Sequence, residues 1–241
     1  MFRGIFVTGT DTNVGKTVVS AALMLRYRDE APLRYWKPIQ TGIERDDDSA
    51  EVTRLARCAA DEIFYCGVRL PGGVSPHLAA RRSGTYISVH QVVDLLREAD
   101  LTLRHGQGDA EPRRAGKVRP AAPRWIVEGA GGVFAPLNDR ESMLDLMGAL
   151  GIPVLVVARS TLGTINHTRL TVETLRQRKL RVAGVAMVGP ADEENRVAIE
   201  WHAAAEVIAQ MPMFDPLVPD ALAQWVVRDF DRNGVLFGCL R

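Results

Sequence analysis

Short runs of consecutive apolar residues alternate along the chain with stretches in which apolar residues recur every three or four positions. The first pattern is typical of buried strands and the second of helices with one buried face. The apolar runs predict strands at 4–8, 34–42 (stopped by Pro38), 124–132, 151–160 and 181–189. The periodic stretches predict helices at 15–28, 48–60, 88–101, 163–180, 193–211 and 219–231.

Strands that are apolar throughout and alternate with helices are typical of a parallel sheet covered on both faces. The pattern therefore predicts an α/β fold, with a single doubly wound, mainly parallel sheet flanked by helices and residues 1–241 in one domain. In such sheets ligands bind beyond the carboxyl ends of the strands. The segments that follow strands, and in which chemistry is expected, are 9–17, 37–42, 129–132 and 159–166.

Composition narrows the class of protein. The chain has 241 residues, of which 46% are apolar, and a formal net charge of +1, so nothing in its charge indicates a nucleic-acid partner. The apolar run at the N-terminus is too short for a signal peptide or a membrane span, and no membrane partner is expected. Cys58, Cys66 and Cys239 lack metal-ligand spacing, which favours reduced thiols in a cytoplasmic protein. Residues 104–123 are rich in Gly, Pro and Arg and predict an inserted surface loop.

The stretch GTDTNVGKT at 9–17 has the features of a phosphate-binding loop, because it joins a predicted strand to a predicted helix. In the strict pattern four residues separate the two glycines. Here five separate Gly9 from Gly15, and Thr10 stands where the strict pattern has glycine. We expect Lys16 to contact the β- and γ-phosphates and the Thr17 hydroxyl to bind Mg²⁺.

Charged side chains follow other predicted strands. Lys37, fixed by Pro38, is either a surface lysine or a cation that stabilises a transferring phosphoryl group. Glu128, placed at the end of its strand, is either a solvated strand end or a Mg²⁺ ligand. The acidic run 46–48 precedes a helix, for which Asp48 or Ser49 is the expected N-cap.

The stretch LGTINHTRLT at 162–171 opens a predicted helix with Gly163 and Thr164. Free backbone N–H groups at a helix N-terminus can hold a carboxylate. For Asn166 and His167, ordinary polarity of a helix surface is an equally good interpretation.

Taken in order, six segments between residues 7 and 171 resemble the dethiobiotin synthetase family. They are VTGTDTNVGKT, KPIQTG, the acidic run 46–48, SPHLAA, VEGAGG and LGTINHTRLT. The resemblance implies a P-loop NTPase-like fold and ATP-dependent carboxylation and ring closure of 7,8-diaminononanoate. In that reaction CO2 forms a carbamate, the γ-phosphate gives a carbamic–phosphoric anhydride, and dethiobiotin, ADP and phosphate result.

The resemblance also implies roles for residues. Lys16 and Lys37 are catalytic. Thr17, Asp48 and Glu128 hold Mg²⁺, with Asp46 and Asp47 as alternatives to Asp48. The ATP contacts are Asn13, Val14, Gly15, Lys16, Thr17, Val18, Glu128, Gly129, Ala130 and Gly131. Thr12 and Thr41 meet the substrate, and Gly163, Thr164 and Asn166 receive its carboxylate from the second subunit of a homodimer.

The chain departs from the family at Asn13, where many relatives have Glu, and at Val188-Gly189, where many have an Asn-Asp pair that reads adenine. Base specificity is therefore expected to be relaxed. A second hypothesis is a nucleotide-switched ATPase of the partition or septum-positioning type, but Asp11 stands where those proteins have a signature Lys. A third, an amide-forming ligase, requires a glutamine-hydrolysing domain for which no residues remain.

Overall fold

The apolar runs form the strands of a parallel sheet in the computed structural model, which describes residues 2–105 and 123–240. All six residues of β1 are buried, as the uninterrupted apolar run predicts. The strands are β1 Gly4–Gly9, β2 Leu33–Trp36, β3 Ile39–Thr41, β4 Ile63–Phe64, β5 Val68–Leu70, β6 Arg124–Gly132, β7 Val154–Arg159, β8 Val182–Val188 and β9 Val207–Met211.

Helices connect most of these strands. They are α1 Lys16–Tyr27, α2 Asp48–Ala56, α3 Pro76–Arg82, α4 Val89–His105, α5 Met143–Leu150, α6 Thr164–Gln177, α7 Glu193–Ala203, α8 Pro219–Asp229 and α9 Phe237–Leu240, with a 3₁₀ turn at Ala60–Glu62. Within residues 2–105 and 123–240, none of the helices is both long and apolar enough to cross a membrane.

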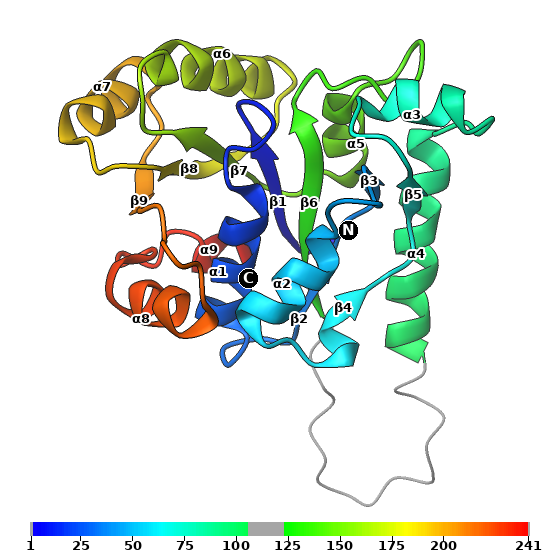
Figure 1. Cartoon of the computed structure of the whole chain (residues 1–241), viewed down its shortest axis with the longest axis horizontal. Helices are drawn as coiled ribbons and strands as arrows, with labels where there is room; N and C mark the ends of the chain where they lie inside the picture. The colour runs from blue at the N-terminus through cyan, green and yellow to red at the C-terminus, as the bar shows by residue number, and fades with distance from the viewer. Residues whose placement is uncertain (1, 106–122, 241) are drawn as a thin grey trace, which may run out of the picture.

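The central sheet has seven strands in the order β4-β2-β6-β1-β7-β8-β9, and all its neighbouring strands are parallel. β3 and β5 form a separate two-stranded parallel sheet. The α/β fold class with a doubly wound parallel sheet is thus confirmed. Because β6 and β7 flank β1, the loop after β1 lies where the chain direction across the sheet reverses, which is where such folds bind ligands (Figure 1).

Each face of the sheet has its own apolar core. Ile5 and Val7 of β1 pack with α1, α2 and α8, whereas Phe6 points to the opposite face, toward α4, α5 and α6. This alternation is the two-residue period of a strand covered on both faces. The two cores fix β1 from both sides, and β1 leads directly into the glycine-rich loop and α1 (Figure 1).

Two predicted elements are wrong in their extent. The helix predicted over 193–211 ends at Ala203, where Ala204 takes a left-handed conformation with φ 48°, and β9 follows as an edge strand. The alanines favour helix locally, but Val207 and Ile208 are β-branched and lie against β8. The strand predicted over 34–42 is two short strands, because β2 ends before Pro38 and β3 pairs with β5 instead.

Smaller corrections concern caps and boundaries. The N-cap of α2 is Asp47, whose carboxylate accepts from the backbone N–H groups of Ser49 and Ala50, and neither Asp48 nor Ser49 has this role. Glu128 lies inside β6 and does not end it. The first two positions of the predicted 104–123 insert belong to α4, and residues 106–122 lie outside the described residues. The single-domain expectation stays a prediction.

The C-terminal segment is attached to α1 through a buried carboxylate. Asp231, 1% exposed, accepts a hydrogen bond from the Tyr27 hydroxyl at the end of α1. It also accepts from the backbone N–H groups of Val235 and Leu236, both at 2.8 Å. Three donors satisfy a carboxylate that is removed from water, and the helix carrying the glycine-rich loop is thereby tied to the end of the chain.

We predict that Tyr27→Phe lowers the free energy of unfolding by about 1.5–3 kcal/mol, the range for a lost hydrogen bond to a charged group. Urea denaturation followed by circular dichroism measures this. Tyr86→Phe is the matched control, because Tyr86 is 64% exposed, and it should change stability by less than about 0.5 kcal/mol. Equal stabilities for the two variants would show that the Tyr27–Asp231 contact contributes nothing.

Candidate nucleotide and metal site

The loop between β1 and α1 takes its shape from two residues with a left-handed backbone conformation. Asn13 has φ 54° and Gly15 has φ 95°, and Gly15 is the residue before α1. Glycine adopts this conformation without the strain that other residues would have, and a Cβ at this position would in addition come within 3.1 Å of the Val188 side chain. The loop therefore presents the backbone at the start of α1 to its open side, where an anion would be stabilised.

Lys16 lies across this loop. Its ammonium Nζ donates to the backbone carbonyl of Asp11 at 3.1 Å. Burial, and then the positive charge of Lys37, lower the pKa of Lys16 to about 8. An anion placed in the loop would remove this penalty, because it would give the buried ammonium a partner of opposite charge.

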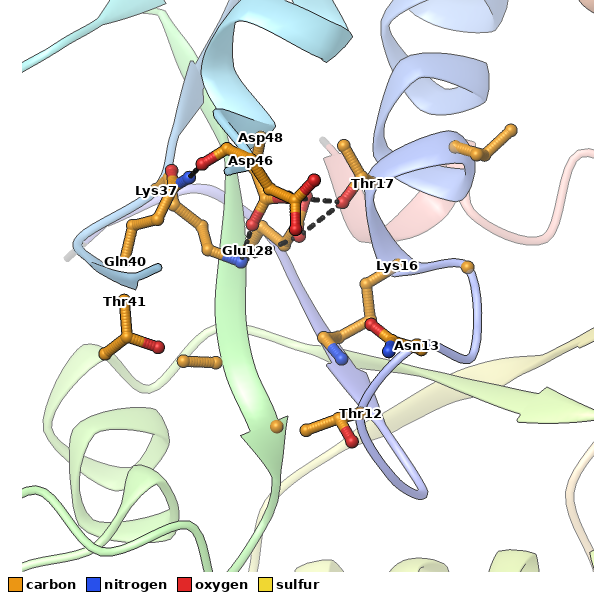
Figure 2. Close-up of a pocket in the computed structure, with 14 residues that line it drawn as sticks. Thr12, Asn13, Lys16, Thr17, Lys37, Gln40, Thr41, Asp46, Asp48 and Glu128 are labelled. Carbon is orange, nitrogen blue, oxygen red and sulfur yellow. Dashed lines mark hydrogen bonds and ion pairs between the residues drawn. The ribbon is translucent and has the colours of Figure 1, made fainter. Parts of the chain in front are cut away.

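Three oxygen-bearing side chains meet at the first turn of α1. The Thr17 hydroxyl lies 3.0 Å from Asp48 Oδ1 and 3.1 Å from Glu128 Oε1. These residues come from α1, α2 and β6, and Figure 2 shows them pointing toward one another. The carboxylate of Asp48 is thus the one, among the three aspartates at 46–48, that joins this cluster.

The ammonium of Lys37 lies between the two carboxylates. Its Nζ lies 2.8 Å from Glu128 Oε1 and 2.5 Å from Asp48 Oδ2, and it also donates to the Gly129 carbonyl at 3.0 Å (Figure 2). Burial alone would lower the pKa of Lys37, but the two carboxylates outweigh it and raise this pKa above its ordinary value. Burial raises the pKa of Asp48, but the attraction of Lys37, together with the Thr17 hydrogen bond, outweighs burial and lowers this pKa below its ordinary value. Lys37 and Asp48 are therefore both charged at neutral pH.

Tyr35 binds the second oxygen of the Glu128 carboxylate. Its hydroxyl donates to Glu128 Oε2 at 2.9 Å, and both residues are 0% exposed. Burial, and then the charge of Glu128, raise the pKa of Tyr35 well above its ordinary value, so the phenol remains a donor. Sequence reasoning missed this residue, since a tyrosine in an apolar run reads as core.

A cavity of about 370 Å³ connects these groups with the loop. Its lining includes most of the predicted site residues: Thr12, Asn13, Gly15, Lys16, Thr17, Val18, Thr41, Lys37, Asp48, Glu128, Ala130 and Gly131. Asp46, the alternative to Asp48 as a metal ligand, lines it too. Gln40 also lines it and was not among the predicted contacts, although it stands in the quoted KPIQTG segment. The structure thus brings together residues from four separate segments of the sequence.

Five predicted residues lie elsewhere. Gly129 contacts the site through its carbonyl, which accepts from Lys37. Val14 is buried and does not line this cavity. Gly163, Thr164 and Asn166 do not line the cavity of their own chain, and the hydroxyl of Thr164 lies 3.5 Å from that of Thr168.

A second hollow, of about 360 Å³, adjoins the other side of the loop. Asn13, Gly15 and Val18 line both spaces. The rest of its lining is mostly apolar and consists of Val14, Arg159, Thr161, Val188, Gly189, Pro190, Met211, Pro212, Met213, Phe214 and Leu217. A polar cavity and an apolar hollow that meet at a phosphate-type loop suit a ligand with a charged end and a flat apolar end.

The oxygens at Thr17 fit a hard divalent cation. Mg²⁺ binds through one or two carboxylates, with waters and phosphate oxygens completing its shell. Thr17, Asp48 and Glu128 supply a hydroxyl and two carboxylates of this kind. Residues 2–105 and 123–240 contain no cluster of three His, Cys, Asp or Glu side chains that could hold a metal by themselves.

The chain is similar to known proteins over most of its length. A family model described as an AAA domain matches residues 3–221. The ATP-dependent dethiobiotin synthetase BioD of Paramagnetospirillum magneticum is 43% identical over 209 residues, 87% of each chain. That of Brucella ovis is 36% identical over 226 residues, 94% of this chain and 93% of the relative.

A longer relative, the biotin biosynthesis bifunctional protein BioCD of Bordetella avium, is 42% identical over 224 residues. The match covers 92% of this chain but only 42% of that protein. This chain thus corresponds to less than half of the bifunctional relative.

Among solved structures, a ParA family ATPase from Chlorobium tepidum has a TM-score of 0.55 at 8% identity, covering 94% of this chain and 98% of that one. The MinC:MinD cell division complex of Aquifex aeolicus has a TM-score of 0.51 at 13% identity, covering 98% and 96%. These similarities show the fold alone. The sequence matches are far closer, and by them the chain belongs to the dethiobiotin synthetase family.

Proposed function

We propose that this protein closes the cyclic urea of dethiobiotin from 7,8-diaminononanoate, CO2 and ATP. The observation that carries the proposal is the cluster of Lys37, Glu128, Asp48 and Thr17 beside a phosphate-type loop, in a chain of this family. Transfer of a phosphoryl group requires positioning and charge neutralisation more than covalent help from the protein. An array of two lysines and two carboxylates, buried except for Asp48, is suited to that task.

The chemistry runs in three steps. One amine of the substrate adds to CO2 and loses a proton, giving a carbamate. A carbamate oxygen takes the γ-phosphoryl group of ATP, and ADP leaves. The second amine then attacks the carbamoyl carbon and expels phosphate, which closes the ring.

The side chains around the cavity are placed to bind the phosphates, the metal ion and the substrate. Lys16 and the backbone of the loop would hold the β- and γ-phosphates, with the nucleotide also lying along Asn13–Val18 and Glu128–Gly131. Lys37 would contact the oxygens that gain negative charge during transfer. Thr17, Asp48 and Glu128 would hold Mg²⁺, which when bound neutralises phosphate charge. Thr12 and Thr41, which both line the cavity and lie in the lower part of the view in Figure 2, would meet the diamine end of the substrate.

The distant carboxylate of the substrate would be received by a second copy of the chain. Gly163, Thr164 and Asn166 lie at the start of α6 and outside the cavity of their own chain, which supports a role in a neighbouring site. Gly163 precedes the helix with φ 93° and no side-chain cap, so the N-terminus of α6 is open to an anion. We therefore propose a homodimer with shared active sites. Its free thiols Cys58, Cys66 and Cys239 suit the reducing cytoplasm.

The reaction itself is tested by phosphate release from Mg-ATP. We expect release only when bicarbonate and 7,8-diaminononanoate are both supplied, and a product whose mass is that of the ring-closed urea. Omission of each component in turn is the control. Phosphate release that does not depend on the diamine would overturn the proposal in favour of a nucleotide switch.

Lys37→Met should lower kcat by roughly 10²–10³-fold, or about 3–4 kcal/mol, the effect of losing one donor to the charge that develops in the transition state. Lys179→Met is the matched control, since Lys179 lies on the surface after α6, and it should retain the kcat of the parent protein. Thermal denaturation of both variants separates loss of catalysis from loss of folding. A Lys37→Met protein with near-normal kcat would exclude the catalytic role.

Base discrimination should be weak. The hollow beside Gly15 and Val188 is mostly apolar, and where many relatives have an Asn-Asp pair this chain has Val188-Gly189. ATP should be used, but GTP, CTP and UTP should compete within about a hundredfold, or about 2.7 kcal/mol. Comparison of kcat/KM for the four nucleotides measures this, and a preference for ATP above that limit would contradict the prediction.

A further inference from the structure

Two polar side chains from the small sheet form a hydrogen-bonded brace behind the acidic segment 46–48. The guanidinium of Arg69, on β5, donates from Nη1 to Gln40 Oε1 at 2.7 Å and from Nη2 to Ser49 Oγ at 3.1 Å. The amide Nε2 of Gln40, on β3, donates to the backbone carbonyl of Asp46 at 2.6 Å. Gln40 and Ser49 are 3% and 0% exposed, so these contacts are shielded from water.

The brace holds the chain on both sides of Asp48. It fixes the carbonyl of Asp46, two residues before, and the hydroxyl of Ser49, one residue after. Between them Asp47 caps α2, which sets the start of the helix. The carboxylate of Asp48 is then directed at Thr17 and Lys37.

Arg69 influences the site by holding Gln40 and Ser49 in place, and it does not itself reach the cavity. It does not appear among the residues that line the cavity, whereas Gln40, Asp46 and Asp48 do. Its fork-shaped guanidinium satisfies one acceptor on β3 and one on α2, which a single ammonium group cannot match in geometry. Without it, Gln40 loses the partner of its carbonyl oxygen, and the buried Ser49 hydroxyl loses a donor.

We propose that Arg69 is a positioning residue which, with Gln40, sets the place of Asp48 and thereby the affinity of the site for its divalent cation. The identification of Asp48 as a metal ligand rests on the proposed function. Partners that orient a metal ligand commonly change metal affinity about 10–100-fold when they are removed. The small sheet of β3 and β5 thus serves the site although it contributes no charged ligand to it.

Binding of Mn²⁺ to the ADP-loaded full chain tests the brace, with free Mn²⁺ measured by electron paramagnetic resonance. Arg69→Met should weaken Mn²⁺ binding about tenfold, the lower end of the range for such partners. Its affinity for ADP without metal should stay within about twofold of that of the parent chain, because the loop at 9–17 is untouched. A general loss of structure would lower both affinities together.

Arg45→Met is the matched control. Arg45 lies on the same connection between β3 and α2, is exposed, and loses the same charge on substitution. It should leave both affinities within about twofold of the parent values. An equal effect of Arg45→Met and Arg69→Met on Mn²⁺ would mean that net charge and not the brace sets the affinity, and would overturn the proposal.

If Arg69→Met does not fold, Arg69→Lys and Ser49→Ala provide the same test with smaller changes. Lysine keeps the charge but only part of the fork, and alanine removes one acceptor, so each should weaken Mn²⁺ binding about threefold. Unchanged Mn²⁺ affinity in the folded variants would refute the brace, even if the parent chain makes dethiobiotin. Weakened binding in a chain that makes no dethiobiotin would support the brace and refute the proposed function.

Discussion

The buried ammonium of Lys37 between Glu128 and Asp48 is the interaction on which the arrangement of the site depends. A charge withdrawn from water is tolerated only with partners of opposite charge and with its hydrogen bonds satisfied. Glu128 is 0% exposed and contacts Thr17 of α1, Tyr35 of β2 and Lys37, which lies in the connection just after β2. Loss of one member leaves the others uncompensated, so the cluster ties together segments that are distant in the sequence.

The register of the sheet creates this contact. Trp36, the last residue of β2, pairs with Val127 of β6, so Lys37, the residue after β2, comes to lie beside Glu128. Val7 of β1 pairs with Glu128 itself, which places the carboxylate next to the strand that leads into the glycine-rich loop. A slip of one residue between β2 and β6 would place Lys37 and Glu128 on opposite faces of the sheet. The apolar cores that fix the register therefore also fix the charges.

Local features were readable from the sequence, and long-range ones were not. The loop at 9–17 is one continuous segment, so the spacing of its glycines and lysine is visible in the sequence and predicts a phosphate-binding loop. Apolar runs predict β1 and β6, and helical periodicity predicts α1. Tyr35 reads as an apolar strand residue, because only the pairing of β2 with β6 places its hydroxyl at Glu128. β9 was missed for a related reason, since its alanine-rich approach favours helix until β8 supplies a partner strand.

Asp11 anchors the loop through its carboxylate and its backbone carbonyl. The carboxylate of Asp11 accepts from the Thr12 N–H at 2.7 Å and pairs with Arg159 at the end of β7, while its carbonyl accepts from Lys16. The Thr12 contact is the largest cause of the lowered pKa of Asp11, with Arg159 adding to it. The longer loop is therefore fastened to β7 and to its own lysine.

A lysine at position 11 could make neither the Arg159 pair nor the Thr12 contact, because it offers no acceptor and carries the charge of Arg159. The negative charge at position 11 thus stabilises the loop of this chain through the contacts with Thr12 and Arg159. It gives a structural reason why a chain with the fold of the partition and septum-positioning ATPases lacks their signature lysine.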